Sequence, residues 1–206
     1  MNSSKTILKT TVLFAGLRLI TIFINIGISK FIAFFLGVSG IGFYGIISNT
    51  LSLITSVADL GVSKSSIRNI AEARGQEDSV EISTTITVVK KLLFFTGLTG
   101  ATLTILLSYF ISVWSFNDGK YWFSFVLLGI AVFFTIINVG RASILQGMRE
   151  LKLITLNTSI SAIAGFIISL PLIYFFKFNG IVYSLLSTAI IGFVVSSYFI
   201  ERVKIN

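Results

Sequence analysis

The chain has 206 residues and a formal net charge of +8, is 54% hydrophobic and only 12% charged, and has a mean hydropathy of +0.95. A soluble domain carries about 25% charged residues, so this composition excludes an ordinary water-soluble protein and indicates a membrane protein. The absence of Cys and His excludes disulfides, thiol nucleophiles, imidazole bases and the usual zinc or haem ligands, and we expect no metal or cofactor.

Several apolar segments are long enough to cross a membrane, which takes about 20 residues per helix. Gly37, Gly40 and Gly42 around Ser39 predict a tight turn between the first two of them. Pro171 removes the hydrogen bond to the Ile167 carbonyl and should bend the fifth helix near its outer end. The predicted fold class is an all-α, polytopic membrane protein with a single bundle of transmembrane helices over residues 1–206. We expect helices over residues 11–36, 41–60, 87–114, 121–145, 153–176 and 180–200.

The basic residues between these segments predict the topology. They are concentrated before the first helix, after the second, between the fourth and fifth, and after the sixth, whereas only Lys120 and Lys177 lie on the other side. By the positive-inside rule, both termini are expected to be cytoplasmic. This asymmetry explains the positive charge better than nucleic-acid binding does, and no nucleic-acid partner is expected.

The longest connection, residues 61–83, contains an amphipathic piece. Ile67, Ile70 and Ala71 lie on one side of it, whereas Arg68 and Glu72 face elsewhere. This pattern favours a surface helix at the cytoplasmic interface, with a docking site for a partner as the alternative.

Three stretches carry a family resemblance: "LGVSGIGFYG", "ADLGVSKSSIRNIAEA" and "LQGMRELK". With them, the chain from Thr11 to Glu201 resembles the N-terminal half of Wzx-type polysaccharide flippases, in the multidrug/oligosaccharidyl-lipid/polysaccharide exporter superfamily. The resemblance implies one bundle of a two-bundle transporter in the bacterial inner membrane. It also implies that lipid-linked oligosaccharide, such as O-antigen or capsule repeat units, is flipped across that membrane by alternating access. The expected partners are this substrate, membrane lipid, and a second six-helix bundle, either a C-terminal half or another copy.

Charged residues within membrane spans are costly and mark candidate sites. Arg18 and Asp59 are expected at similar depths, where they either form a salt bridge or line a cavity in which Arg18 attracts an anion. Arg18 and Asn25 share a polar stripe on the first helix. Lys30 lies about 120° away from Arg18 around that helix, and either snorkels outward or faces the cavity.

The fourth helix adds Asn138 and Arg141, one turn apart. Small polar residues at such spacing indicate either close helix packing or the lining of a polar cavity. Arg18, Lys30 and Arg141 are the candidates for binding a pyrophosphate; the full set of candidate substrate-binding residues is Arg18, Asn25, Lys30, Asp59, Asn138 and Arg141.

No catalytic constellation accompanies these residues, and we expect no enzyme. The acidic residues of the long loop have no base, nucleophile or metal set beside them. The alternatives are a drug or lipid exporter of the same superfamily, and a truncated or non-transporting membrane subunit. A membrane-embedded glycosyltransferase is disfavoured because acidic pairs are lacking.

Overall fold

The computed structural model describes residues 2–76 and 79–201, and the side chains of residues 16, 19–76 and 80–201 within them. Over these ranges the chain forms helices and turns and no strand, so the all-α class is confirmed. The elements are α1 (Asn2–Ala58), α2 (Val62–Gly75), α3 (Ser79–Leu106), α4 (Ser108–Phe116), the 3₁₀ helix η1 (Gly119–Tyr121), α5 (Trp122–Gly147) and α6 (Leu151–Ile200).

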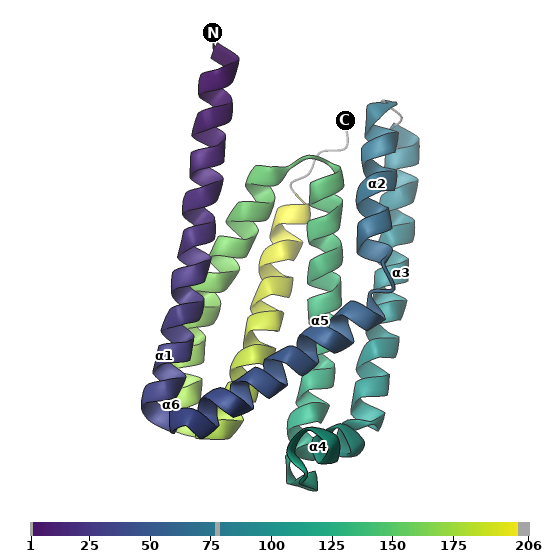
Figure 1. The fold of residues 1–206 in the computed structure, drawn as a ribbon. Helices are drawn as coiled ribbons and strands as arrows, with labels where there is room; N and C mark the ends of the chain where they lie inside the picture. The colour runs from purple at the N-terminus through teal and green to yellow at the C-terminus, as the bar shows by residue number, and fades with distance from the viewer. Residues whose placement is uncertain (1, 77–78, 202–206) are drawn as a thin grey trace.

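Four of the described helices are long and apolar enough to cross a membrane. These are Leu19–Ala58, Val80–Leu106, Gly119–Gly147 and Leu151–Ile200. The helices run roughly side by side, and Figure 1 shows two distinct ends of the bundle. At the end that we call the terminal end, α1 begins, α6 finishes, and α5 is joined to α6; the opposite end, with α4, we call the hairpin end.

Helix α1 consists of two arms that meet at Gly37, whose φ of 65° and ψ of −162° interrupt the helix. The turn expected over residues 37–40 is thus one residue long, because the helix resumes at once. A left-handed φ favours glycine at position 37. Gly40 is needed for another reason: a Cβ there would overlap the Cβ of Leu36 in the first arm.

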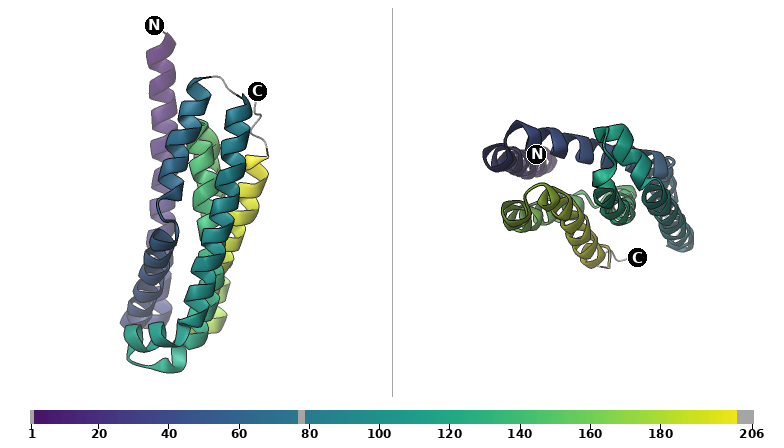
Figure 2. Two further views of the ribbon diagram at one scale, coloured as in Figure 1. Left: turned by 90° about the vertical axis from the view of Figure 1, so that its right-hand side faces the viewer. Right: turned by 90° about the horizontal axis from the view of Figure 1, so that it is seen from below.

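The second arm of α1 then crosses the bundle. Figure 1 and the right-hand view of Figure 2 show that it runs from the side of α6 to the side of α3, diverging from the first arm. Ile32 of the first arm and Phe43 and Ile47 of the second are buried in one core cluster with Phe125 of α5 and Ile181 of α6. Both arms are therefore anchored to the bundle close to the hairpin end.

Helix α6 also has two arms, which meet at Lys177 (φ 51°, ψ −121°). This position falls between the two helices expected over residues 153–176 and 180–200. Gly180 allows the arms to touch, because a Cβ there would lie 2.8 Å from the Cα of Ile173. Pro171 lies within the first arm, and the residue with non-helical angles is Lys177.

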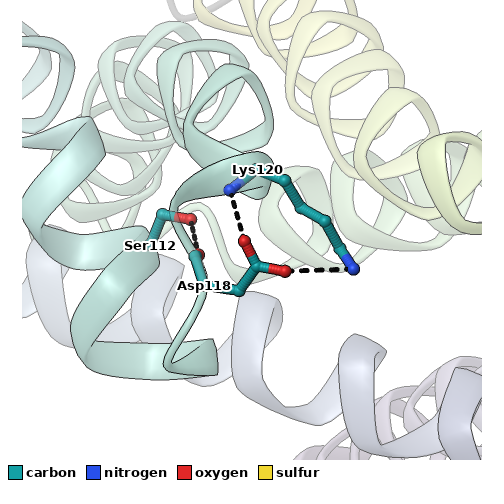
Figure 3. Close-up of polar contacts among 3 residues, drawn as sticks. All are labelled: Ser112, Asp118 and Lys120. Atoms are coloured by element: carbon teal, nitrogen blue, oxygen red, sulfur yellow. Dashed lines mark hydrogen bonds and ion pairs between the residues drawn. The ribbon is translucent and has the colours of Figure 1, made fainter.

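The helix expected over residues 87–114 differs most from the structure. It begins earlier, at Ser79, and is divided by Leu107 into α3 and α4. The chain then turns through Asn117 and Asp118 into η1. In that turn Ser112 Oγ donates to the Asp118 carbonyl at 2.7 Å, and the Asp118 carboxylate accepts from the Lys120 backbone N–H at 3.0 Å (Figure 3). Asp118 also forms an ion pair with Lys120 Nζ at 3.0 Å.

The amphipathic piece forms helix α2, which stands beside α3 (Figure 1). Its apolar face is covered by protein: Ile70 and Ala73 are buried against Ile86 of α3 and Ile144 of α5. A Cβ at Gly147 would lie 2.8 Å from that of Ile70, so α2 and α5 approach closely. The expected surface helix is therefore present, but this face packs on the bundle instead of facing lipid.

Candidate functional site

The polar network of the bundle joins α5 to the second arm of α6. Asn138 Nδ2 donates to the Ala189 carbonyl at 3.0 Å, and its Oδ1 accepts from Ser196 Oγ at 2.9 Å. Gly192 makes room for this amide, since a Cβ at that position would lie 2.7 Å from Asn138 Nδ2. Both ends of the Asn138 amide are thus satisfied between two apolar helices, as burial of a polar group requires.

Arg141 lies one turn further along α5 and binds the same arm. Its Nη1 donates to the Phe193 carbonyl at 2.8 Å, to Ser196 Oγ at 3.0 Å and to Ser197 Oγ at 2.6 Å. The guanidinium carbon lies 4.2 Å from the centroid of the Phe193 ring, a cation–π distance. Arg141 is half-buried, and its charge is permanent because a guanidinium does not lose its proton in proteins.

A pocket of about 470 Å³ opens beside this arginine, between α3, α5 and α6. Its walls include the aromatic rings of Phe94, Phe133 and Phe193. Lys90 adds a second cation to the lining, and Glu201 is the one acidic residue there. We call this the Arg141 pocket. It lies in the half of the bundle nearer to the terminal end, where α6 finishes.

The hydrogen-bond geometry leaves part of the guanidinium available. All three bonds that Arg141 makes with described residues use Nη1, so Nη2 and Nε can donate to a ligand in the pocket. An arginine fork of this kind suits a phosphate, which accepts two parallel hydrogen bonds. Aromatic walls and hydroxyls around it suit an organic ligand with polar groups.

Asn25 and Lys30 lie elsewhere, on the first arm of α1. Both side chains are exposed, and with Ser29 and Ile41 they line a shallow, open hollow of about 370 Å³. The structure therefore brings Asn25 and Lys30 together at the hairpin half of α1, and Asn138 and Arg141 together between α5 and α6. It does not unite the two pairs.

Asp59 is separate from both pairs, in the turn between α1 and α2. Its Oδ1 accepts from Ser63 Oγ at 2.5 Å and its Oδ2 from the Ser63 backbone N–H at 3.4 Å, so it caps the start of α2. The Arg18 side chain lies outside the described residues. Its pairing with Asp59 stays a prediction, and the divergence of the two arms of α1 separates the helices that carry them (Figure 1).

Sequence reasoning did not identify the partners of Arg141 on α6. Ser196 and Ser197 are adjacent, about 100° apart around α6, and both hydroxyls reach Arg141. The available signal was this serine pair in an otherwise apolar segment near the end of α6. The Phe193 carbonyl has no sequence signal, because every residue carries one.

In a comparison with known proteins, a family model described as polysaccharide biosynthesis protein matches residues 7–205. No curated protein and no solved structure matches the chain.

Proposed function

The chain belongs to the polysaccharide biosynthesis protein family, and from this premise we propose that it moves a lipid-linked oligosaccharide across the bacterial inner membrane. The cargo would be a polyprenyl-pyrophosphate carrying an O-antigen or capsule repeat unit. The movement is flipping by alternating access, with no covalent step. Its polar headgroup must cross a hydrocarbon layer about 30 Å thick, so the protein has to supply a polar path.

The Arg141 pocket is the observation that carries this proposal. A fixed guanidinium with free donors, and Lys90 on the facing helix, provide positive charge for a pyrophosphate. Ser197, which also lines the pocket, carries a hydroxyl of the kind that can bind a sugar, while Asn138 and Ser196 hold the second arm of α6 against α5 behind it. An ionisable group at such a depth is expensive and is typically kept for a ligand or an ion path.

The topology follows from the charges. We propose six crossings, made by both arms of α1 and of α6 together with α3 and α5, with the helical break at Leu107 within the third. Helix α2, with Lys64 and Arg68, rises from the middle of the bundle toward the terminal end, where Arg149 joins α5 to α6, whereas Lys120 and Lys177 lie at the hairpin end. The positive-inside rule then makes the terminal end cytoplasmic, so that the Arg141 pocket opens toward the cytoplasmic leaflet.

A second bundle would complete the path. The first arm of α1 exposes large apolar residues such as Ile22, Phe23 and Ile26 beside the polar Asn25 and Lys30. Mixed surfaces of this kind face protein or water rather than lipid alone. We propose that a C-terminal half, or a second copy, covers this arm, and that Arg18, Asn25, Lys30 and Asp59 line the route between the two bundles.

Complementation tests the proposal. The chain is expressed with a matching C-terminal bundle in a strain that lacks its own flippase, and surface polysaccharide is measured. If flipping is the function, the chain restores surface polysaccharide. Arg141→Gln should then abolish this restoration and Arg149→Gln should leave it intact, at equal protein levels in the membrane. Altered drug tolerance without polysaccharide would instead identify an exporter, and no effect on either would identify a subunit that does not transport.

A further inference from the structure

A second hollow, as large as the Arg141 pocket, lies on another face of the bundle. It measures about 470 Å³ and runs between the second arm of α1 and the lower half of α3, ending at α4. We call it the α1–α3 groove. On the α1 side it is lined by Leu53, Val57 and Leu60, and on the α3 side by Phe95, Leu103 and other residues. None of the candidate substrate-binding residues lines it.

The groove is apolar although three threonines are among its lining residues. Thr96, Thr99 and Thr104 all line it, but each hydroxyl donates to a carbonyl of its own helix. The Thr99 bond to the Phe95 carbonyl is 2.8 Å long, and the Thr104 bond to the Gly100 carbonyl is 2.7 Å long. With these donors used within the helix and the other lining residues apolar, the groove does not suit a sugar or a phosphate as its main occupant.

The shape of the groove favours a flexible chain over a helix of another protein. Its floor is closed where α1 and α3 touch, since a Cβ at Gly100 would lie 2.7 Å from that of Ala58. Its rims are bulky: Leu53, Val57 and Phe95 are all more than 60% exposed. Helices that pack in membranes approach through small residues, and a helix about 10–12 Å wide would meet these three bulky side chains before it reached Ala58 and Gly100 in the floor.

Two lysines without a described ion pair lie near the end of the groove away from α4, whereas Lys120, which follows α4, is paired with Asp118. Lys91 lies one helical turn before the lining residue Phe95, and Lys64 lies in the first turn of α2, just after the lining residue Leu60. Both lysines are exposed. The nearby Asp59 carboxylate is engaged by Ser63. At the other end, α4 carries Tyr109, Phe110 and Trp114.

We infer that the α1–α3 groove holds one acyl chain of an anionic phospholipid, whose phosphate lies at Lys64 and Lys91. The apolar walls of the groove bind the acyl chain through van der Waals contacts, while the lysines select an anionic headgroup. The bound lipid would bridge the second arm of α1 to α3, two elements that meet at few large buried side chains. This site is independent of the proposed transport function.

The test uses the full chain in nanodiscs that contain phosphatidylglycerol with a photoreactive diazirine on its acyl chain. Crosslinks are mapped by mass spectrometry. We expect them at residues 53–60 and 95–107. Thr99→Trp fills the groove and should remove them, whereas Thr102→Trp should not: Thr102 is exposed on the same helix, bonds its own backbone in the same way, and does not line the groove.

Headgroup selection is measured in the same assay. Each of Lys64→Gln and Lys91→Gln should lower crosslinking about fivefold, the effect expected of one lysine near an anionic surface, and Lys152→Gln should leave it unchanged. Crosslinks that lie elsewhere, or that survive Thr99→Trp, contradict the inference. So does equal crosslinking by a photoreactive phosphatidylcholine. Displacement by an equal amount of polyprenyl phosphate would assign the groove to an isoprenoid chain and overturn the assignment to a phospholipid.

Discussion

The Ser196 hydroxyl donates a hydrogen bond to Asn138 Oδ1 at 2.9 Å, although the two residues are 58 positions apart. The same serine hydroxyl accepts from Arg141 Nη1 at 3.0 Å. Ser196 therefore connects the amide and the guanidinium of α5, and it holds the second arm of α6 at the Arg141 pocket. With the Phe193 carbonyl and the Ser197 hydroxyl, this hydroxyl helps to position the guanidinium of the proposed anion site.

The pair can be tested with a double-mutant cycle. Asn138→Ala and Ser196→Ala should each lower the stability of the protein, and the double variant should lose less than the sum. The expected coupling is about 0.6 kcal/mol, typical of hydrogen bonds between membrane helices. Reversible unfolding in mixed micelles measures it. Thr135→Ala is the control, because the Thr135 hydroxyl donates to the Ala131 carbonyl of its own helix. The coupling between Thr135→Ala and Ser196→Ala should be close to zero.

The second arm of α1, which follows the reversal of the chain at Gly37, carries two glycines that can be compared. Gly40→Ala should destabilise the protein by about 1–3 kcal/mol, because the new methyl group meets Leu36. Gly45→Ala should stabilise it by about 0.5–1 kcal/mol, because nothing lies within 4 Å and alanine is the better helix former. Thermal unfolding of both variants decides the matter, and similar effects of the two would contradict the packing of the reversal.

The residue at which the two arms of α6 meet, Lys177, has a strained backbone. Lys177 has φ 51° and ψ −121°, a conformation that side chains disfavour and glycine tolerates. Lys177→Gly should therefore raise the stability by about 1 kcal/mol. Lys152→Gly, in the first turn of the same helix, should lower it. A stability loss for both substitutions would place the reversal at another residue.

The turn before η1 predicts a pH effect. The backbone hydrogen bond from Lys120, followed by its side-chain bond, lowers the pKa of the exposed Asp118 carboxyl below its ordinary value of 3.8. A carboxyl with a lowered pKa stabilises the fold above its ordinary pKa, and this contribution is lost as the pH falls through the lowered value. NMR titration of labelled aspartate should show the shift. Lys120→Gln should reduce the pKa shift of Asp118 in part. Ser112→Ala should not change this shift, because the Ser112 hydroxyl bonds the backbone carbonyl of Asp118 and not its carboxylate.

Local signals in the sequence predicted most of the architecture. The glycines around Ser39 predicted the reversal of α1, because a positive φ and a close approach both favour glycine. The break at Leu107 carries no such signal: neither glycine nor proline lies between residues 101 and 118, and the hydroxyl residues there, such as Thr104 and Ser108, are compatible with a continuous helix. Apolar runs predict that a segment enters a membrane, and they do not predict where a helix within it bends.

The candidate site was predictable only in part. Asn138 and Arg141 stood out because polar groups are costly in an apolar helix, and they lie together in the structure. Their partners depend on the rotation of α6 against α5, which the sequence does not specify. Asp59 shows the opposite difficulty. The sequence predicted either a salt bridge with Arg18 or a place in a cavity, and this stays a prediction; the local partner Ser63, one turn further on with two donors, was not predicted.

The central claim is that the Arg141 pocket receives the pyrophosphate of a lipid-linked oligosaccharide during flipping. Its most direct test reconstitutes the chain with a matching C-terminal bundle in liposomes. Polyprenyl-pyrophosphate-linked oligosaccharide is added to the outer leaflet, and protection of its sugar from periodate is followed over time. The protein should speed protection. Arg141→Gln should slow the rate about tenfold to a hundredfold, the loss expected for a hydrogen bond to a charged group.

Two further variants separate binding from folding. Lys90 is an exposed cation in the lining of the pocket, and its side chain makes no described hydrogen bond. Lys90→Gln should therefore slow flipping without lowering the unfolding temperature. Arg149→Gln, outside the pocket, should flip at the normal rate. The account predicts a slow rate for both pocket variants and a normal rate for the control. Normal flipping by folded Arg141→Gln and Lys90→Gln would contradict it.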